Sequence, residues 1–203
     1  MLISKLTEGI FYRFCQLATN NPDQKYFFII DEINRGNMSK IFGELLMLID
    51  REYRETKVML AYSGRPFTVP ENIYIIGMMN TADRSLALID YALRRRFSFF
   101  PMDPGFNTNG FTEYQKGLSN DTLDALINQI KQLNREIMDD KSLGRGFQIG
   151  HSYFCGREIK GCSEEWLRSV VEFDILPTLG EYWFDDPNKL QRWEKNLRGV
   201  FDD

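Results

Sequence analysis

The stretch FFIIDEINRGN, residues 27–37, decides the fold of this chain. It begins, with Tyr26, as an unbroken apolar run rich in aromatic and branched residues, which is typical of a strand buried on both faces of a parallel sheet. Asp31 and Glu32 follow directly, at the end of the strand where open parallel sheets place their ligands. Where such a pair serves nucleotide hydrolysis, the first acid holds magnesium and the second orients the attacking water. The alternative is a strand that simply ends in two solvated acids.

A second apolar run, over residues 73–79, predicts another fully buried strand, and it ends in Asn80, Thr81, Ala82 and Asp83. Asn80 could hydrogen-bond a terminal phosphate or the attacking water. Residues 81–83 could equally cap the helix that follows, since Thr or Asp before a helix stabilises it. The two interpretations are compatible, with Asp83 as the cap and Asn80 as the sensing residue.

Three consecutive arginines, Arg94, Arg95 and Arg96, end the helix expected over 84–96, and a short third strand is expected over 97–100. Positive charge at a helix C-terminus is favoured by the helix dipole, so a solvated helix end is one interpretation. The other is an arginine that reaches phosphates bound by a neighbouring subunit and supplies charge to the transition state. The acids, Asn80 and the arginines are all expected at the same edge of the sheet, which favours the second interpretation.

The chain changes character over residues 104–109, where Pro, Gly and Asn gather and a domain boundary is expected. Further helices are predicted in the first twenty residues and over 39–49, 123–138, 165–179 and 189–200, with a hairpin over 56–69. Strands that alternate with helices indicate a parallel sheet. We therefore expect an α/β part over residues 1–104 and a small all-helical part over 105–203.

The composition excludes several classes of protein. The chain has 203 residues, of which 43% are hydrophobic and 27% charged, as in an ordinary globular protein. A net charge of −4 provides no basic field for nucleic acid or anionic membrane. No apolar run approaches the roughly 20 residues of a membrane span, and Lys5, Glu8 and Arg13 interrupt the region where a signal peptide would be apolar. We expect a cytoplasmic protein.

Cysteine and histidine are scarce. Cys15, Cys155, Cys162 and the single His151 are too few for a disulfide framework or a zinc site with four ligands from this chain. His151, Cys155 and Cys162 could hold zinc if a partner chain added a fourth ligand, but no Cys-x2-Cys knuckle accompanies them. A core or hinge histidine and buried, apolar cysteines are the favoured interpretation.

The motifs DEINRGN, MNTADRS and DYALRRRF, in this order and spacing, resemble the AAA+ ATPase superfamily. Within it, the chain is similar to the McrB family of GTP-hydrolysing motor subunits of modified-cytosine restriction systems. The likeness continues through GRGFQIGHSYF and LGEYWFDDP and covers nearly the whole chain. It implies an α/β fold: a partial AAA+ P-loop NTPase core, with a parallel sheet that lacks the P-loop strand, and then a small helical lid subdomain.

The resemblance implies roles for individual residues. Asp31 would be the Walker B ligand of Mg2+, Glu32 the catalytic acid and Asn80 the sensor 1 residue. The signature loop at the nucleotide would be completed by Thr81, Asp83 and Arg84.

The remaining implied residues lie further along the chain. Arg95, with Arg96 close behind it, would be the arginine finger that acts on a neighbouring subunit. His151 would lie near the hinge between the lid and the nucleotide. The hairpin around Ser63 and Gly64 would be the insertion that precedes sensor 1 in this branch of the superfamily.

The resemblance also implies partners and cofactors. The intact protein would form a ring, hexameric in the family, hydrolyse GTP with Mg2+ at subunit interfaces, and drive an McrC-type endonuclease subunit. A separate N-terminal domain would recognise DNA. The motifs do not distinguish GTP from ATP, so an ATP-using AAA+ remodeller stays an alternative, as does a truncated interaction module without catalytic activity.

The chain contains no G-x4-G-K-[ST] phosphate loop. In the family this loop precedes Walker B, so the chain is expected to begin inside the motor domain and to be inactive on its own. The sensor strand would then lack a neighbour, which leaves backbone N–H and C=O groups unpaired. We expect this gap to be closed by rearrangement or by another copy, or to remain as an exposed edge.

Overall fold

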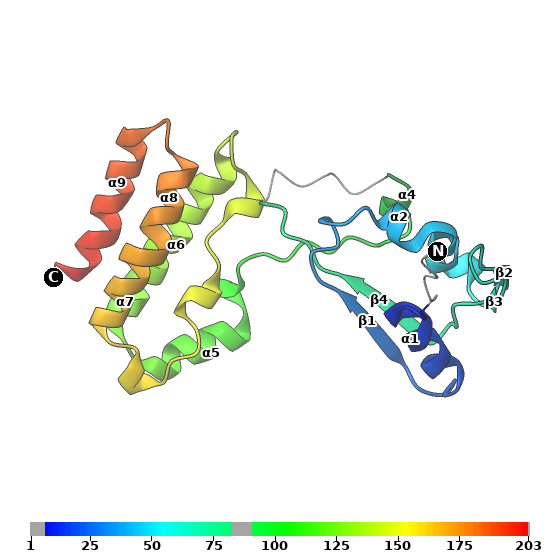
Figure 1. Cartoon of the computed structure of the whole chain (residues 1–203). Helices are drawn as coiled ribbons and strands as arrows, with labels where there is room; N and C mark the ends of the chain where they lie inside the picture. Colours follow the sequence, from blue (N-terminus) through cyan, green and yellow to red (C-terminus); the bar gives the residue numbers. More distant parts are fainter. Residues whose placement is uncertain (1–6, 83–90, 203) are drawn as a thin grey trace. The chain divides into compact units, whose positions relative to one another are not determined.

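The computed structural model describes residues 7–82 and 91–202 (Figure 1). The chain divides into two compact units, Met1–Phe100 and Pro101–Asp203. Across the described ranges, no helix has the length and apolar character needed to cross a membrane.

The first unit is built on a parallel pair of strands. Strand β1 (Tyr26–Ile30) pairs with β4 (Ile73–Gly77), from Tyr26 opposite Ile73 to Ile30 opposite Gly77. The hairpin predicted over 56–69 is present as the antiparallel strands β2 (Val58–Met59) and β3 (Pro66–Phe67). The other elements are α1 (Ile10–Thr19), α2 (Met38–Phe42), η1 (Gly43–Leu45), α3 (Leu46–Ile49), η2 (Arg51–Tyr53) and α4 (Tyr91–Arg94).

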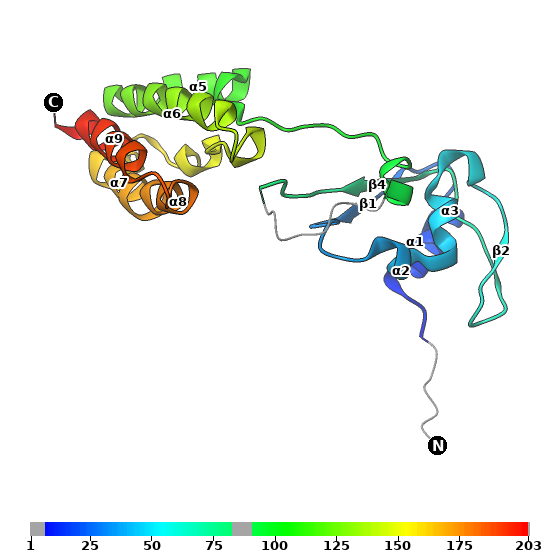
Figure 2. The same cartoon turned by 90° about the horizontal axis from the view of Figure 1, so that it is seen from above.

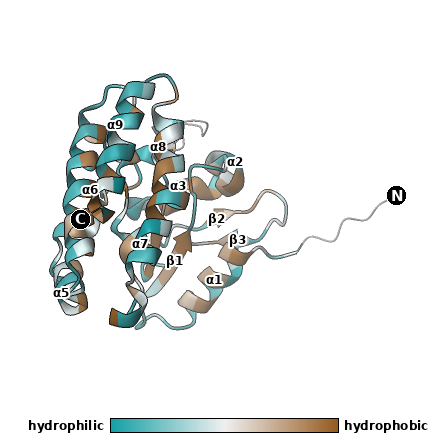
Figure 3. Cartoon of the chain, turned by 90° about the vertical axis from the view of Figure 1, so that its left-hand side faces the viewer, coloured by the Kyte–Doolittle hydropathy of each residue, from teal (hydrophilic) through white to brown (hydrophobic). Residues whose placement is uncertain are grey.

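Aromatic side chains of α1 cover one face of the β1–β4 pair. The ring of Phe28 packs 5.0 Å from that of Phe11 and 5.2 Å from that of Phe14. The opposite face is open, because Phe27 is 54% and Ile29 59% exposed. Figure 3 shows that β1 is nevertheless hydrophobic along its length.

The expectation that β1 and β4 are each buried on both faces is therefore wrong for this chain. Burial alternates along β1, and Tyr74 and Ile76 of β4 are exposed beside Phe27 and Ile29. The physical reason is that, among the described residues, the packed helices lie against one face of this two-stranded sheet and no second layer covers the other. Of the three outcomes expected for the missing neighbour, the described residues show an exposed edge, since β4 pairs only with β1.

Two further sequence predictions need correction. Residues 97–100 are not a strand, because no partner strand lies beside them in the described part of the chain to complete their hydrogen bonds. The helix predicted over 39–49 is broken at Gly43, whose φ of +49° ends α2 and is a conformation that glycine adopts readily. Of the helix predicted over 84–96, α4 is described, and residues 83–90 lie outside the described ranges.

The regular elements of the second unit, in its described residues, are all helical, as predicted. Its helices are α5 (Asn109–Leu118), α6 (Asp121–Asp139), α7 (Glu164–Val170), the π-helical turn η7 (Val171–Ile175), α8 (Leu176–Tyr182) and α9 (Pro187–Arg198). Short 3-10 turns lie at η3 (Gly105–Asn107), η4 (Arg145–Phe147), η5 (His151–Phe154), η6 (Ile159–Gly161) and η8 (Gly199–Phe201). Helices α6, α7, α8 and α9 run alongside one another (Figures 1 and 2). The sequence predicted neither α5 nor the 3-10 turns.

Side-chain caps and one apolar stripe explain these helices. At the start of four helices, the side chain of the N-cap residue accepts a hydrogen bond from the backbone N–H three residues later, which satisfies an otherwise unpaired donor of the first turn. These N-cap residues are Thr108, Asn120, Ser163 and Asp186. The stripe predicted for α6 is fully buried in a core that runs through the whole unit; its members are Leu126, Ile127, Ile130, Leu133 and Ile137.

Asp140, directly after α6, is the centre of a polar cluster in this unit. Its carboxylate accepts hydrogen bonds from Lys189 Nζ at 2.6 Å, Trp183 Nε1 at 3.0 Å, and the Ser142 hydroxyl and N–H at 2.7 and 2.8 Å. These donors, Lys189 first, hold the pKa of Asp140 well below its usual range. Asp140 therefore ties the end of α6 to the start of α9.

The open face of β1 gives a prediction for two neighbouring residues. Phe28→Ala should cost about 2–4 kcal/mol of stability because it removes the packing against α1, whereas Phe27→Ala should cost less than about 1 kcal/mol. Hydrogen exchange of the β1 amides measures the local cost. Equal costs at the two positions would mean that the second face is covered in solution.

The Asp140 cluster predicts a pH-dependent stability. Asp140→Asn should cost about 2 kcal/mol at neutral pH, because it removes charge-assisted hydrogen bonds. The folded pKa is depressed, so this contribution is complete above the unfolded pKa of about 4 and is lost as pH falls below it. Tryptophan fluorescence during urea unfolding reports this unit, which contains all three tryptophans. Asp139→Asn, at the exposed neighbouring position, is the control. A loss of stability in Asp140→Asn that does not become smaller in acid would contradict the prediction.

Candidate functional site

The two motif-bearing loops meet at the ends of β1 and β4. The pairing continues past the strands, because Met78 N–H donates to Ile30 O and Ile33 N–H donates to Met78 O, both at 2.9 Å. The side-chain amide of Asn34 reaches the backbone oxygen of Asn80 at 3.4 Å. The segment 31–37 and the segment 78–82 therefore lie together at one edge of the sheet.

Gly77 lies against the Ile33 side chain at this approach. A Cβ atom at position 77 would lie 2.7 Å from Cδ1 of Ile33, so a larger residue would force that side chain to shift. The Ile33 side chain is buried with Met38, Phe42 and Leu93. The acidic turn is therefore fixed on one side by backbone hydrogen bonds and on the other by the core.

Asp31 is an exposed carboxylate at this edge, and one of its oxygens accepts the N–H of Glu32 at 2.9 Å. Mg2+ prefers oxygen ligands and is commonly held by one or two carboxylates together with phosphate oxygens and water. Within the described ranges, no three His, Cys, Asp or Glu side chains gather as a metal site. An exposed carboxylate such as Asp31 has the ligand chemistry that fits an Mg2+ ion held mainly by phosphate and water oxygens.

Glu32 has an uncommon backbone conformation, with φ at +51°. Its carboxylate forms an ion pair with Arg35, at 3.0 Å between Oε2 and Nε, and its backbone oxygen accepts the N–H of Arg35 at 2.8 Å. The sequence did not single out Arg35. The sequence does place a base three positions after an acid, which is a spacing at which side chains can pair. The spacing alone does not show where either side chain points.

The sensor loop follows β4 directly. Asn80 is exposed, and its side-chain oxygen accepts the N–H of Ala82 at 2.9 Å, which shapes the start of the loop. Thr81 beside it is exposed. Asp83 and Arg84 lie outside the described residues, and so does the proposed cap.

The arginines lie at the end of α4, of which Arg94 is the last residue and after which Arg95 and Arg96 follow. Leu93 anchors this short helix in the same buried cluster as Ile33. Arg95 is exposed and Arg96 half-buried, while the Arg94 guanidinium lies 5.6 Å from the ring centroid of Phe99. The acidic turn and the arginine-bearing helix are thus attached to one core, and Arg95 is accessible to another molecule.

His151 belongs to the second unit. Its Nδ1 accepts the N–H of Gly105 at 2.9 Å, and its ring meets those of Phe106 and Phe111 edge-on. A Cβ at Gly105 would lie 2.9 Å from Nε2 of His151, so the glycine makes room for the imidazole. His151 therefore holds the segment that enters this unit, and a nucleotide contact at His151 stays a prediction.

A second tie lies nearby. Arg145 donates two hydrogen bonds to Asp103, and this hydrogen bonding lowers the pKa of Asp103. The interpretation of the cysteines as buried holds for Cys162 but is wrong for Cys155, which is exposed. The Sγ of Cys155 donates to the His151 backbone oxygen at 3.3 Å.

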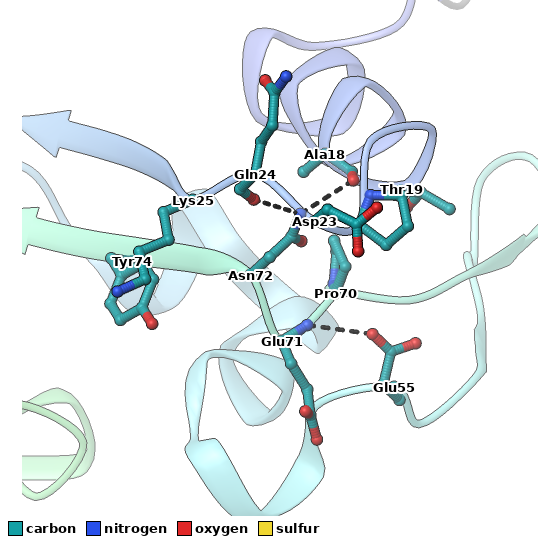
Figure 4. A pocket seen from close by; sticks show the side chains of 11 residues that line it. Ala18, Thr19, Asp23, Gln24, Lys25, Glu55, Pro70, Glu71, Asn72 and Tyr74 are labelled. Carbon is teal, nitrogen blue, oxygen red and sulfur yellow. Dashed lines mark hydrogen bonds between the residues drawn. The ribbon is translucent and has the colours of Figure 1, made fainter.

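A pocket of about 560 Å³ lies at the opposite end of the strands, next to Lys25 and Asn72 (Figure 4). The Asn72 side chain donates to the backbone oxygens of Ala18, Asn21 and Gln24 at 2.8 to 3.1 Å. This pocket contains none of the residues predicted for the site, and Asn72 serves to join α1 to the start of β4.

Comparisons with known proteins agree with this arrangement. Residues 125–191 match the family described as "McrB, alpha-helical lid domain", and residues 2–97 match "AAA domain (dynein-related subfamily)". The chain is 50% identical over 202 residues to the Type IV methyl-directed restriction enzyme EcoKMcrB subunit of Escherichia coli K12, an alignment that covers 95% of this chain and 44% of that protein.

A second relative is the Type II restriction enzyme BsuMI component YdiS of Bacillus subtilis 168. It is 34% identical over 96 residues, which cover 40% of this chain and 28% of that protein. The chain thus spans less than half the length of the curated relatives it matches. The acidic turn beside the sensor loop, the helical second unit and these matches together show an AAA domain followed by an McrB-type helical lid, and the chain is similar to the C-terminal portion of the McrB subunit.

Proposed function

We propose that this chain is part of the GTP-hydrolysing AAA+ motor subunit of a modified-cytosine-specific DNA restriction complex. The observation that carries the proposal is the hydrogen-bonded contact between the acidic turn and the sensor loop, which brings Asp31, Glu32 and Asn80 to one sheet edge. The printed names of both relatives, which are components of restriction enzymes, support the assignment to a restriction system.

Each residue of the site has a distinct chemical task in this proposal. Asp31 holds Mg2+, which when bound neutralises charge on the nucleotide phosphates. Glu32 orients the attacking water and accepts its proton, and Asn80 fixes the water or the terminal phosphate by hydrogen bonding. Thr81, Asp83 and Arg84 complete the loop around the phosphate.

The arginines act between subunits in this proposal. Arg95, assisted by Arg96, stabilises the charge that develops on the phosphoryl group held by a neighbouring copy. Such an arrangement requires an oligomer, for which we propose a ring of six that drives an McrC-type endonuclease. DNA recognition is assigned to another domain, since the net charge of this chain is −4.

The second candidate function is that of an interaction module without catalytic activity. It is favoured by the lack of a G-x4-G-K-[ST] sequence in these 203 residues, because that loop supplies the N–H groups and the lysine that hold phosphates. A third candidate, an AAA+ protein that uses ATP, has the same site residues. Comparing GTP with ATP in one assay separates it from the first.

Mixing two inactive variants tests the shared site. The assay uses a chimaera, in which this chain replaces the matched 202-residue segment of the E. coli relative. Glu32→Gln and Arg95→Ala should each slow GTP hydrolysis at least about 100-fold. In an equal mixture about one quarter of the interfaces keep both groups, so phosphate release should recover to about that fraction of the unsubstituted rate.

Arg94→Ala is the matched control and should hydrolyse GTP at nearly the unsubstituted rate. Failure to recover activity at any mixing ratio would contradict the role of Arg95 between subunits. A folded, oligomeric chimaera that hydrolyses neither nucleotide would favour the interaction module.

A further inference from the structure

We infer that Arg35 is a positioning residue for Glu32: it holds the Glu32 carboxylate in an ion pair that a nucleotide phosphate releases by binding the guanidinium. This inference rests on the proposed function, because it concerns when Glu32 becomes available to the attacking water. It assigns Arg35 two successive partners at the same sheet edge, first a carboxylate of its own chain and then a phosphate.

The ion pair lies in a turn with a fixed backbone. The two side chains meet at 3.0 Å, although 55% of the Arg35 side chain and 51% of the Glu32 side chain are exposed. An exposed pair usually contributes little, since two long side chains must be ordered to form it. Here the backbone of the turn is already closed by the Arg35 N–H to Glu32 O bond and by the Ile33 N–H to Met78 O bond. Less conformational freedom is therefore lost when the side chains pair.

The backbone of Glu32 provides the second observation. A φ of +51° is uncommon for a residue other than glycine and persists where the surroundings impose it. The Glu32 N–H is held by Asp31 Oδ1 at 2.9 Å, and the next residue, Ile33, is held by β4 and by the core. Such strain is concentrated at functional sites, where it presets the direction of a side chain.

The pairing affects the chemistry proposed for Glu32. A general base must reach the proton that it accepts, at about 3 Å or through one water. The ion pair holds Oε2 against Arg35 and so fixes the direction of the carboxylate. Glu32 is therefore restrained in position, and not free to follow the attacking water, while this pair persists.

Phosphate is a suitable competitor for Arg35. A guanidinium binds carboxylate and phosphate with the same planar arrangement of donors, and a multiply charged phosphate attracts it more strongly than one carboxylate does. Arg35 is more than half exposed and lies within four residues of Asp31, the proposed Mg2+ ligand. Nucleotide bound at this edge can thus displace Glu32 from Arg35, so that Glu32 is released only when there is a phosphate to attack.

The experiment measures steady-state GTP hydrolysis in the chimaera with Arg35→Ala and Arg35→Lys. Arg35→Ala should raise KM about tenfold, because a charged phosphate contact is lost, while kcat is unchanged or higher, because Glu32 is no longer held. Arg35→Lys should recover part of the affinity, since it keeps the charge but not the planar fork. The backbone N–H at position 35 remains in both variants, so the melting temperature should not change.

Arg65→Ala is the matched control, because Arg65 forms an exposed ion pair with Glu8 at 3.2 Å, away from the strand ends. It should leave KM and kcat unchanged. The inference is wrong if Arg35→Ala behaves like Arg65→Ala, or if it lowers kcat tenfold at unchanged KM. A fall in kcat together with the melting temperature, not reversed by Arg35→Lys, would assign Arg35 a purely structural role and also overturn the inference.

The outcome for Glu32 separates the two proposals. If Glu32→Gln hydrolyses GTP normally, the proposed function itself is wrong. If Glu32→Gln is inactive and Arg35→Ala matches the control, only the inference about Arg35 fails.

Discussion

Parallel pairing of β1 with β4, continued by the hydrogen bond from Ile33 N–H to Met78 O, is the constraint on which the candidate site depends. Parallel strands end at the same edge, so residues far apart in the sequence become neighbours there without any side-chain contact between them. Gly77 leaves room for the Ile33 side chain at this approach, and the burial of that side chain holds the turn in place. The positions of the two acids, the asparagine amide and the Arg35 ion pair all follow from this one backbone arrangement.

The sequence predicted well those features that depend on local patterns. The apolar stripe of α6 and the hairpin between β2 and β3 have periodicities or turn residues that hold in any surroundings. The approach of segments 31–37 and 78–82 at one edge of the sheet followed from one rule about parallel sheets. The predictions that were wrong concerned contacts with other elements. An apolar run such as residues 26–30 indicates that both faces of the strand favour burial, but it does not show whether this chain supplies the layer that covers them. The ion pair of Arg35 was missed because it depends on the φ of Glu32, which sequence spacing does not reveal.

The two units differ in how they reach stability. The second has one continuous core, with capped helices and the Asp140 cluster. The first has two smaller clusters and leaves an apolar strand face and a strand edge exposed in its described residues. Exposed apolar surface of this kind is typical of interaction sites. The candidate site thus lies in the unit that leaves these surfaces exposed.

The central claim is that the two loops joined at the strand ends act as one unit on one water molecule. A double-mutant cycle on GTP hydrolysis tests it most directly, with Glu32→Gln, Asn80→Ala and the double variant in the chimaera. Residues that act on the same water are not additive, so the double variant should be no slower than Glu32→Gln alone, within about threefold. Losses that multiply fully in the double variant would show that the two residues act independently, and would contradict the account.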